Sequence, residues 1–90
     1  MQRERLTPDR IRRFSCPPDA KQSFLWDTDA PRLAVRATTG AKSFIFEAKL
    51  NRQTIRVTIG DVRAWNLDDA RTEARRLQTL IDQGIDPRQE

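Results

Sequence analysis

The chain has 90 residues, of which 37% are apolar and 33% charged, and its formal net charge is +4. This length suits a single domain with a thin core, and no apolar run approaches the roughly 20 residues of a membrane span. The opening residues, Met1 to Arg5, lead into no apolar stretch, so we expect no secretory signal. Cys16 stands alone and predicts a free thiol in a reducing cytosol.

Two absent residue types exclude most catalytic chemistry. The sequence holds no histidine, the commonest general base and metal ligand, and no tyrosine. Its three glycines are scattered and cannot form a phosphate-binding loop. Neighbouring carboxylates, Asp27 with Asp29 and Asp68 with Asp69, are typical of turns and helix starts. We therefore expect a chain that is not an enzyme and that binds no metal or cofactor.

The first predicted element is a short helix near the amino terminus. Thr7-Pro8-Asp9 is typical of a helix start, with Thr7 as the cap and Pro8 at the first helical position. This helix is expected to end before Cys16, which two prolines follow.

Strand-like alternation of apolar and polar residues comes next. We predict a three-stranded antiparallel sheet, with a brief apolar stretch before it as an optional short extra strand. Asn51-Arg52 joins the last two strands, although a two-residue hairpin turn prefers glycine after asparagine. The extra stretch is Ser23 to Asp27, and the three strands are Leu33 to about Thr38, Ser43 to Leu50, and Gln53 to Ile59.

A longer helix closes the predicted α+β domain. Asn66 is a good cap, and Gly84 suits the left-handed position after the last turn. The helix arginines Arg71, Arg75 and Arg76 are expected on its solvent face, where Arg75 and Arg76 can pair with nearby acidic or hydroxyl residues of the same helix. We expect one domain over 1–90, with 85–90 as the start of a linker. The helix runs from Leu67 to about Gln83 and carries an apolar stripe of Leu67, Ala70, Ala74, Leu77 and Ile81.

One helix cannot cover both faces of a sheet, so one face should stay open. Its cations and hydroxyl groups would suit a DNA groove, and arginine outnumbers lysine among the basic residues. The same composition is also typical of a solvated antiparallel face, so both interpretations stay open. Trp26 and Trp65 are expected to pack in or beside the core. The predicted open face holds Arg36, Thr38, Ser43, an exposed Ile45, Glu47, Lys49, Thr54, Arg56 and Thr58.

Seven short motifs, weak singly, resemble in order and spacing the amino-terminal arm-type DNA-binding domain of phage and genomic-island tyrosine-recombinase integrases. The resemblance covers nearly the whole chain. The motifs are Leu6-Thr7-Pro8-Asp9 with Ile11-Arg12, Leu25-Trp26-Asp27-Thr28-Asp29, Leu33-Ala34-Val35-Arg36, Gly40-Ala41-Lys42-Ser43-Phe44, Val57-Thr58-Ile59-Gly60, Leu67-Asp68-Asp69-Ala70-Arg71 with Ala74-Arg75, and Gly84-Ile85-Asp86-Pro87.

The resemblance implies three antiparallel strands with a carboxy-terminal helix, and a sheet laid into the DNA major groove at arm-type sites. The family's catalytic tyrosine and its assisting arginine, lysine and histidine belong to a separate domain, so this chain would bind and position DNA. The sequence departs from the family at two points. Arg32 stands where a glycine usually precedes the Leu33 stretch, and Asn51-Arg52 fills a turn that favours glycine.

We therefore predict a non-catalytic module that binds double-stranded DNA during site-specific recombination. The expected partners are arm-type sites, the remaining domains of the same integrase, and excision or host DNA-bending factors, in the cytoplasm and nucleoid of a bacterial host and not at a membrane. The alternative is a protein-interaction module within the recombination complex. Single-stranded RNA binding is disfavoured, because the predicted open face lacks aromatic residues for base stacking. The predicted DNA contacts are Arg36, Thr38, Lys42, Ser43, Lys49, Arg52, Thr54, Arg56 and Thr58, with Lys42 and Arg52 on the DNA backbone.

Overall fold

A computed structural model describes residues 3–89 and confirms the α+β class. No helix among these residues is both long and apolar enough to cross a bilayer. Along the chain the elements are β1 (Arg3–Glu4), α1 (Pro8–Arg13), β2 (Ser23–Asp27), β3 (Leu33–Ala37), β4 (Lys42–Leu50), β5 (Gln53–Asp61), α2 (Leu67–Asp82) and the 3-10 helix η1 (Pro87–Gln89).

The strands form one sheet in the order β1-β2-β3-β4-β5. Strands β2 to β5 pair antiparallel, whereas β1 pairs parallel with β2. The prediction of three strands was therefore too low. The optional stretch Ser23 to Asp27 is a full strand paired with β3, and β1 was missed because two charged residues show no apolar alternation.

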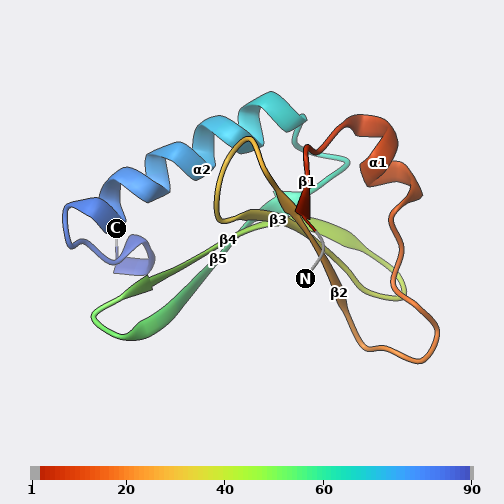
Figure 1. Ribbon diagram of the computed structural model, residues 1–90, viewed down its shortest axis with the longest axis horizontal. Helices are drawn as coiled ribbons and strands as arrows, with labels where there is room; N and C mark the ends of the chain where they lie inside the picture. The colour runs from red at the N-terminus through yellow and green to blue at the C-terminus, as the bar shows by residue number, and fades with distance from the viewer. Residues whose placement is uncertain (1–2, 90) are drawn as a thin grey trace.

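The sheet bends into an arch, and both helices lie on its convex side (Figure 1). The register places Val35 of β3 beside Phe44 of β4, and Phe46 beside Val57 of β5, so these side chains share the side that carries α2. A β-bulge between Phe44 and Ile45 shifts the register of β4 against β5. Such an irregularity increases local twist, which fits the bending of the sheet.

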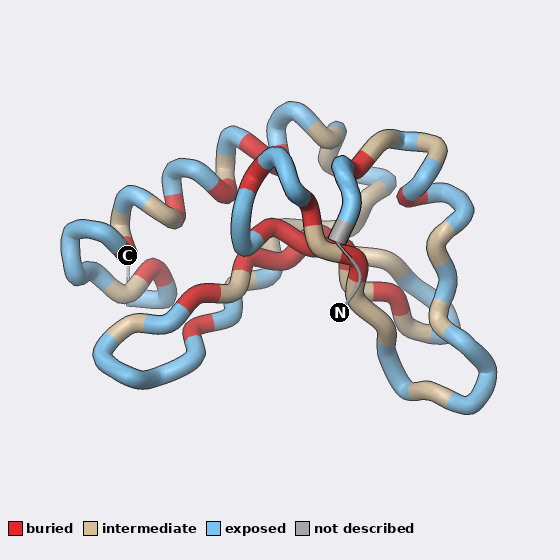
Figure 2. Tube along the Cα trace, in the orientation of Figure 1, coloured by how far each residue is buried: buried red, intermediate tan, exposed pale blue. Residues whose placement is uncertain are grey.

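Helix α2 packs on the sheet through the stripe that the sequence predicts. Ala70, Ala74, Leu77 and Ile81 are buried, and Leu67 is half-buried. Burial is concentrated between the helices and the middle of the sheet, while the hairpin tips are exposed (Figure 2). The small alanines let the helix axis approach the sheet closely, which gives a thin core its density.

Both helices begin and end as their sequence signals predict. Thr7 Oγ1 accepts a hydrogen bond from the Arg10 amide at 3.1 Å, and Asn66 Oδ1 accepts one from the Asp69 amide at 2.8 Å. After α2, Gly84 adopts a φ of 78°. Its amide donates to Ile81 O at 2.9 Å, and the Ile85 amide donates to Leu80 O at 2.8 Å, which is the Schellman arrangement.

Residues 85–89, predicted as the start of a linker, fold back against the domain. Pro87 is buried, and η1 contacts α2 and β5. Whether a linker begins here stays a prediction.

A buried ion pair joins α2 to β2. Arg71 Nε donates to Asp27 Oδ2 at 2.9 Å, and Arg71 Nη2 donates to Leu6 O at 2.8 Å. Asp27 Oδ1 accepts in addition from the Leu6 amide at 3.0 Å, and its carboxylate accepts from the amides of Asp29 and Ala30. The carboxylate is thus saturated with donors, as a buried charge must be.

This ion pair corrects one sequence prediction and extends another. Arg71 was expected on the solvent face of α2, yet its residue is only 5% exposed. Asp27 was expected as a turn residue, and it does cap the turn after β2, but it is 2% exposed and also holds the guanidinium. The error arose because an arginine one position from the apolar stripe looks solvated unless its distant acid partner is known. Arg76 does form the predicted local pair, with Glu73.

The pair also shifts the pKa values of its two partners. Burial alone would raise the pKa of Asp27, but hydrogen bonds from Arg71, Leu6 and Asp29 outweigh it and hold that pKa below its ordinary value of 3.8. The hydrogen bond to Asp27 raises the pKa of Arg71, against the opposing effect of its burial. Both groups therefore stay charged in the folded protein at neutral pH.

Replacing Asp27 with asparagine should lower the free energy of unfolding by about 3–5 kcal/mol at neutral pH, because it leaves a buried guanidinium without its counter-charge. Urea denaturation followed by tryptophan fluorescence measures this. The matched control is Asp29→Asn, at a side chain that is 42% exposed and 3.5 Å from Arg71 Nε; we expect it to cost less than about 1 kcal/mol. Equal effects of the two substitutions would contradict a special role for Asp27.

The pair should also make the domain acid-sensitive in a defined direction. A carboxyl whose folded pKa lies below its unfolded value stabilises the fold above that unfolded value, and the stabilisation is lost as pH falls through the folded pKa. For Asp27 the loss therefore belongs below about pH 3.8. Wild type and Asp27→Asn should converge in stability as pH falls through this range, as denaturation at a series of pH values would show. A constant difference would refute the assignment.

Candidate nucleic-acid interface

The concave side of the arch carries neither helix (Figure 1). The register gives the strand side chains that face this side, which are the set opposite to the one packed under α2. Cross-strand pairs on it follow from the register: Arg36 lies beside Ser43, Lys49 beside Thr54, and Glu47 beside Arg56. We call this side the helix-free face; it comprises Phe24, Trp26, Ala34, Arg36, Ser43, Ile45, Glu47, Lys49, Thr54, Arg56 and Thr58.

An apolar floor occupies the middle of the helix-free face. Phe24 and Trp26 stack with their ring centroids 6.2 Å apart, and both side chains are half-buried. Trp26 pairs with Ala34, which pairs with Ile45, and both of these are fully buried. The prediction of an exposed Ile45 is therefore wrong. Its cover does not come from α1 or α2, because both helices lie on the other side of the sheet (Figure 1).

Arg56 is held over this floor from two directions. Its Nε and Nη2 donate to Glu47 Oε1 at 2.8 and 2.5 Å. Its guanidinium carbon also lies 5.1 Å from the centroid of the Phe24 ring. Because Glu47 is on β4 and Phe24 on β2, the guanidinium of this β5 residue reaches back over the central strands. Its side chain nevertheless remains 40% exposed and open to a ligand.

The other predicted contacts on this face are less constrained. Lys49, Thr54 and Thr58 are exposed on β4 and β5. Arg36 and Ser43 are half-buried neighbours, and within residues 3–89 the buried Nε of Arg36 has no hydrogen-bond partner. Arg36, Lys49 and Arg56 outnumber Glu47, and the register adds one further acid, Asp61 beside Ser43 at the end of β5, which pairs with Arg63. The structure thus gathers six of the nine predicted contact residues on one basic surface.

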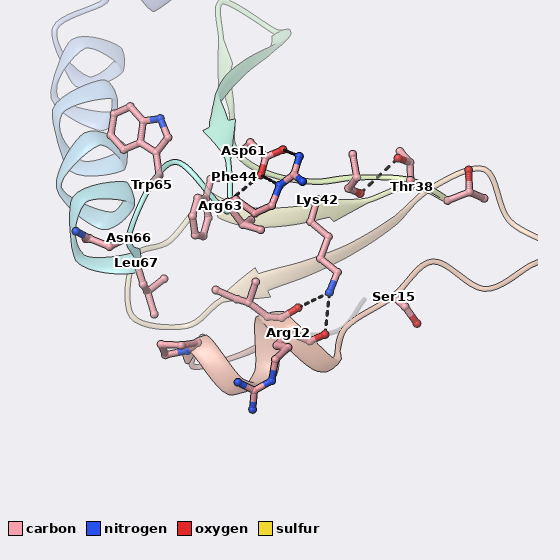
Figure 3. A pocket seen from close by; sticks show the side chains of 16 residues that line it. Arg12, Ser15, Thr38, Lys42, Phe44, Asp61, Arg63, Trp65, Asn66 and Leu67 are labelled. Atoms are coloured by element: carbon pink, nitrogen blue, oxygen red, sulfur yellow. Dashed lines mark hydrogen bonds and ion pairs between the residues drawn. The ribbon is translucent and has the colours of Figure 1, made fainter.

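Lys42 and Thr38 lie elsewhere. Lys42 Nζ donates to the carbonyls of Ile11 and Arg12 at 2.8 and 2.9 Å, at the end of α1. Thr38 sits in the turn after β3, with its amide bonded to Ala41 O at 2.9 Å. Both line a groove of about 670 Å³ between α1, the β3–β4 turn and the start of α2, where Lys42 points toward α1 (Figure 3). This helix-side groove is separated from the helix-free face by the sheet.

The comparisons with known proteins name the family. The sequence model described as "Arm DNA-binding domain" matches residues 6–90. The chain belongs to the arm DNA-binding domain family. It is also 56% identical over 88 residues to "Prophage integrase IntF" of Escherichia coli (strain K12), a match that covers 98% of this chain and 19% of that protein. The chain thus spans about a fifth of its curated relative, and the part it matches is a DNA-binding module without a catalytic domain.

Two arginines of this arm DNA-binding domain adopt a backbone conformation that favours glycine. Arg32 has a φ of 73° and Arg52 a φ of 68°, the latter in the hairpin tip behind Asn51, whose φ is 52°. These are the two positions where the resemblance noted in the sequence led us to expect glycine. Arg32 Nη1 donates to Gln78 Oε1 of α2 at 2.7 Å, so its side chain lies on the side of the sheet that carries α2. Arg52 is exposed at the tip, where a cation could meet a phosphate.

Sequence reasoning missed the aromatic part of the arm domain's open face. Phe24 and Trp26 alternate with Leu25 and Asp27, and that spacing signals that the two rings share one face. Because Ser23 to Asp27 was predicted only as an optional strand, Phe24 and Trp26 were not assigned to the open face. The argument against RNA binding, that the open face has no aromatic residues, is therefore wrong. The preference for DNA over RNA is supported instead by the match to the arm DNA-binding domain family.

Replacing Arg52 with glycine should raise the free energy of unfolding by about 1 kcal/mol, because a left-handed arginine is strained by about 1–2 kcal/mol and glycine gives back part of this in chain entropy. Thermal and urea denaturation measure the gain. Arg32→Gly is the matched control: it relieves the same strain but loses the bond to Gln78, so its gain should be smaller. A destabilised Arg52→Gly protein would contradict the proposed strain.

Proposed function

We propose that the chain binds arm-type sites on double-stranded DNA through its helix-free face, as the DNA-binding module of a longer tyrosine-recombinase integrase. The observation that carries this proposal is the basic, hydroxyl-rich face left open opposite both helices, in a chain of the arm DNA-binding family. Arginine and lysine suit phosphates and guanine edges, and threonine suits phosphates and thymine methyl groups.

The dimensions of the sheet support a major-groove fit. Adjacent strands lie about 4.8 Å apart, so three strands measure about 10 Å across their axes, close to the roughly 12 Å width of the major groove. Strands β3, β4 and β5 carry Arg36, Lys49 and Arg56 and would enter the groove. Strand β2, with Phe24 and Trp26, would lie at its rim. Arg52 at the β4–β5 tip would contact a phosphate.

Lys42 does not join this proposed interface, because its amine is engaged by carbonyls of α1 on the opposite side of the sheet. Thr38 is also left out of the proposed interface, because it lines the groove on the helix-bearing side of the sheet. The proposed contacts are thus Arg36, Ser43, Lys49, Arg52, Thr54, Arg56 and Thr58.

Further partners follow from the proposed role and not from the face itself. The remaining domains of the same integrase would perform strand cleavage, and excision or host DNA-bending factors would bind beside the chain at the attachment region. The place of action would then be the bacterial nucleoid, where the DNA lies. The 56% identity to part of a prophage integrase supports the first of these proposals, that the chain acts with the remaining domains of an integrase.

The test begins with selection of binding sites from duplexes with a randomised centre, since this requires no knowledge of the natural site. The selected duplex and a scrambled duplex of equal composition are then titrated at several salt concentrations. We expect preference for the selected duplex, with log affinity falling against log salt by about 0.9 for each phosphate neutralised. Failure to enrich any sequence would refute arm-site recognition.

The double substitution Lys49→Ala with Arg56→Ala should then raise the Kd for the selected duplex by about tenfold or more, because a base-contacting arginine contributes about 1–3 kcal/mol. The matched control removes two exposed arginines of the helix-bearing side, Arg12 and Arg75. Affinity loss confined to the control would place the DNA on the helices and overturn the sheet-face assignment, provided that thermal denaturation shows both proteins folded.

A further inference from the structure

The helix-free face contains an acidic residue where a DNA-binding surface should avoid one. Glu47 lies on β4 between β3 and β5, its side chain is 23% exposed, and it faces the side where the DNA would approach. An isolated carboxylate there would repel DNA. Glu47, however, accepts two hydrogen bonds from Arg56, and their geometry orients the Arg56 guanidinium.

A guanidinium has two edges that can each form a pair of hydrogen bonds. One edge presents Nε and one hydrogen of Nη2, and the other presents Nη1 and the second hydrogen of Nη2. Glu47 takes the first edge, because Nε and Nη2 both donate to its Oε1. The second edge therefore remains available, and its two parallel donors match O6 and N7 of guanine.

Phe24 limits the remaining freedom of the guanidinium. Its ring centroid is 5.1 Å from the guanidinium carbon, and the ring is itself stacked on Trp26. Arg56 is thus fixed in its plane by an acid of β4 and supported from below by an aromatic ring of β2. A long side chain that is already ordered loses less conformational entropy when it binds.

Resting on the proposed function, we propose that Arg56 is the specificity-determining residue of this face and recognises a guanine through its Nη1–Nη2 edge. Glu47 and Phe24 are its positioning residues. Arg36 and Lys49 differ, since neither has an acid partner on the face within residues 3–89. They contribute affinity, whereas the Glu47–Arg56–Phe24 unit contributes discrimination between sequences.

The decisive measurement is the ratio of affinities for the selected and scrambled duplexes in Glu47→Ala. If Glu47 positions Arg56, the ratio falls about five- to tenfold, because a bidentate arginine–guanine pair discriminates by about five- to 100-fold. Affinity for the scrambled duplex meanwhile rises or stays constant, since a negative charge is lost. Glu47→Gln, which keeps an acceptor, should give an intermediate ratio.

Two controls make the result specific. Glu73→Ala removes the acid that holds Arg76 on α2, with bonds of 2.9 Å from Nε and from Nη2; it should leave the ratio unchanged. Arg56→Lys keeps the charge and loses the fork, so it should lower the ratio as Glu47→Ala does, with the salt slope preserved. In the Arg56→Lys background, Glu47→Ala should have no further effect on the ratio.

Replacing guanines of the selected duplex one at a time by 7-deazaguanine removes the N7 acceptor. One position should weaken wild-type binding several-fold and leave Arg56→Lys unaffected. Equal gains in affinity for both duplexes on Glu47→Ala would show that Glu47 only repels phosphates, and would overturn the inference alone. Wild-type protein without any sequence preference would overturn the proposed function, and the inference with it.

Discussion

The arrangement of this small domain depends on the buried pair of Asp27 and Arg71. The Asp27 carboxylate accepts hydrogen bonds from the Arg71 guanidinium of α2, from the amide of Leu6 and from the two amides of the turn after β2. Three segments far apart in sequence thus meet at a single charge. The ion pair itself adds little net stability, since desolvation offsets much of its attraction, but any structure that separates its members leaves a charge buried and unpaired. The pair therefore selects one arrangement and excludes its competitors.

What the pair fixes is the position of β2, and through it the helix-free face. β2 has only five residues, and its two neighbours are also short, with five residues in β3 and two in β1. Asp27 points toward the helices from the same strand whose Phe24 and Trp26 point away from them. Anchoring the acid consequently fixes the register that places Phe24 under Arg56. The core and the proposed interface share one strand, so loss of the ion pair would also disturb the proposed DNA-binding face.

The sequence predicted the elements that depend on local signals. Thr7, Asn66 and Gly84 mark helix ends by their own chemistry, and the alternation of β4 and β5 fixes which side chains share a face. It failed where the deciding partner is remote. Arg71 looked solvated because Asp27 is 44 positions away, and Ile45 looked exposed because alternation places it on the side without a helix, although it is fully buried. Most of the candidate face followed from alternation alone, and the same alternation places Lys42, the neighbour of Ser43, on the opposite side, where its amine bonds to carbonyls 30 and 31 positions away.

Arg32 and Arg52 both carry the backbone strain of a left-handed conformation, but their side chains differ in whether they compensate it within the fold. At both positions glycine would remove about 1–2 kcal/mol of backbone strain. Arg32 offsets this through its bond to Gln78, which ties the start of β3 to α2. Arg52 has a side chain exposed at a hairpin tip, and no hydrogen bond or ion pair within residues 3–89 explains its presence. Strain that persists without an internal compensation points to a role outside the folded chain. A phosphate beside the β4–β5 tip would supply that compensation, at the end of the same hairpin that carries Lys49 and Arg56.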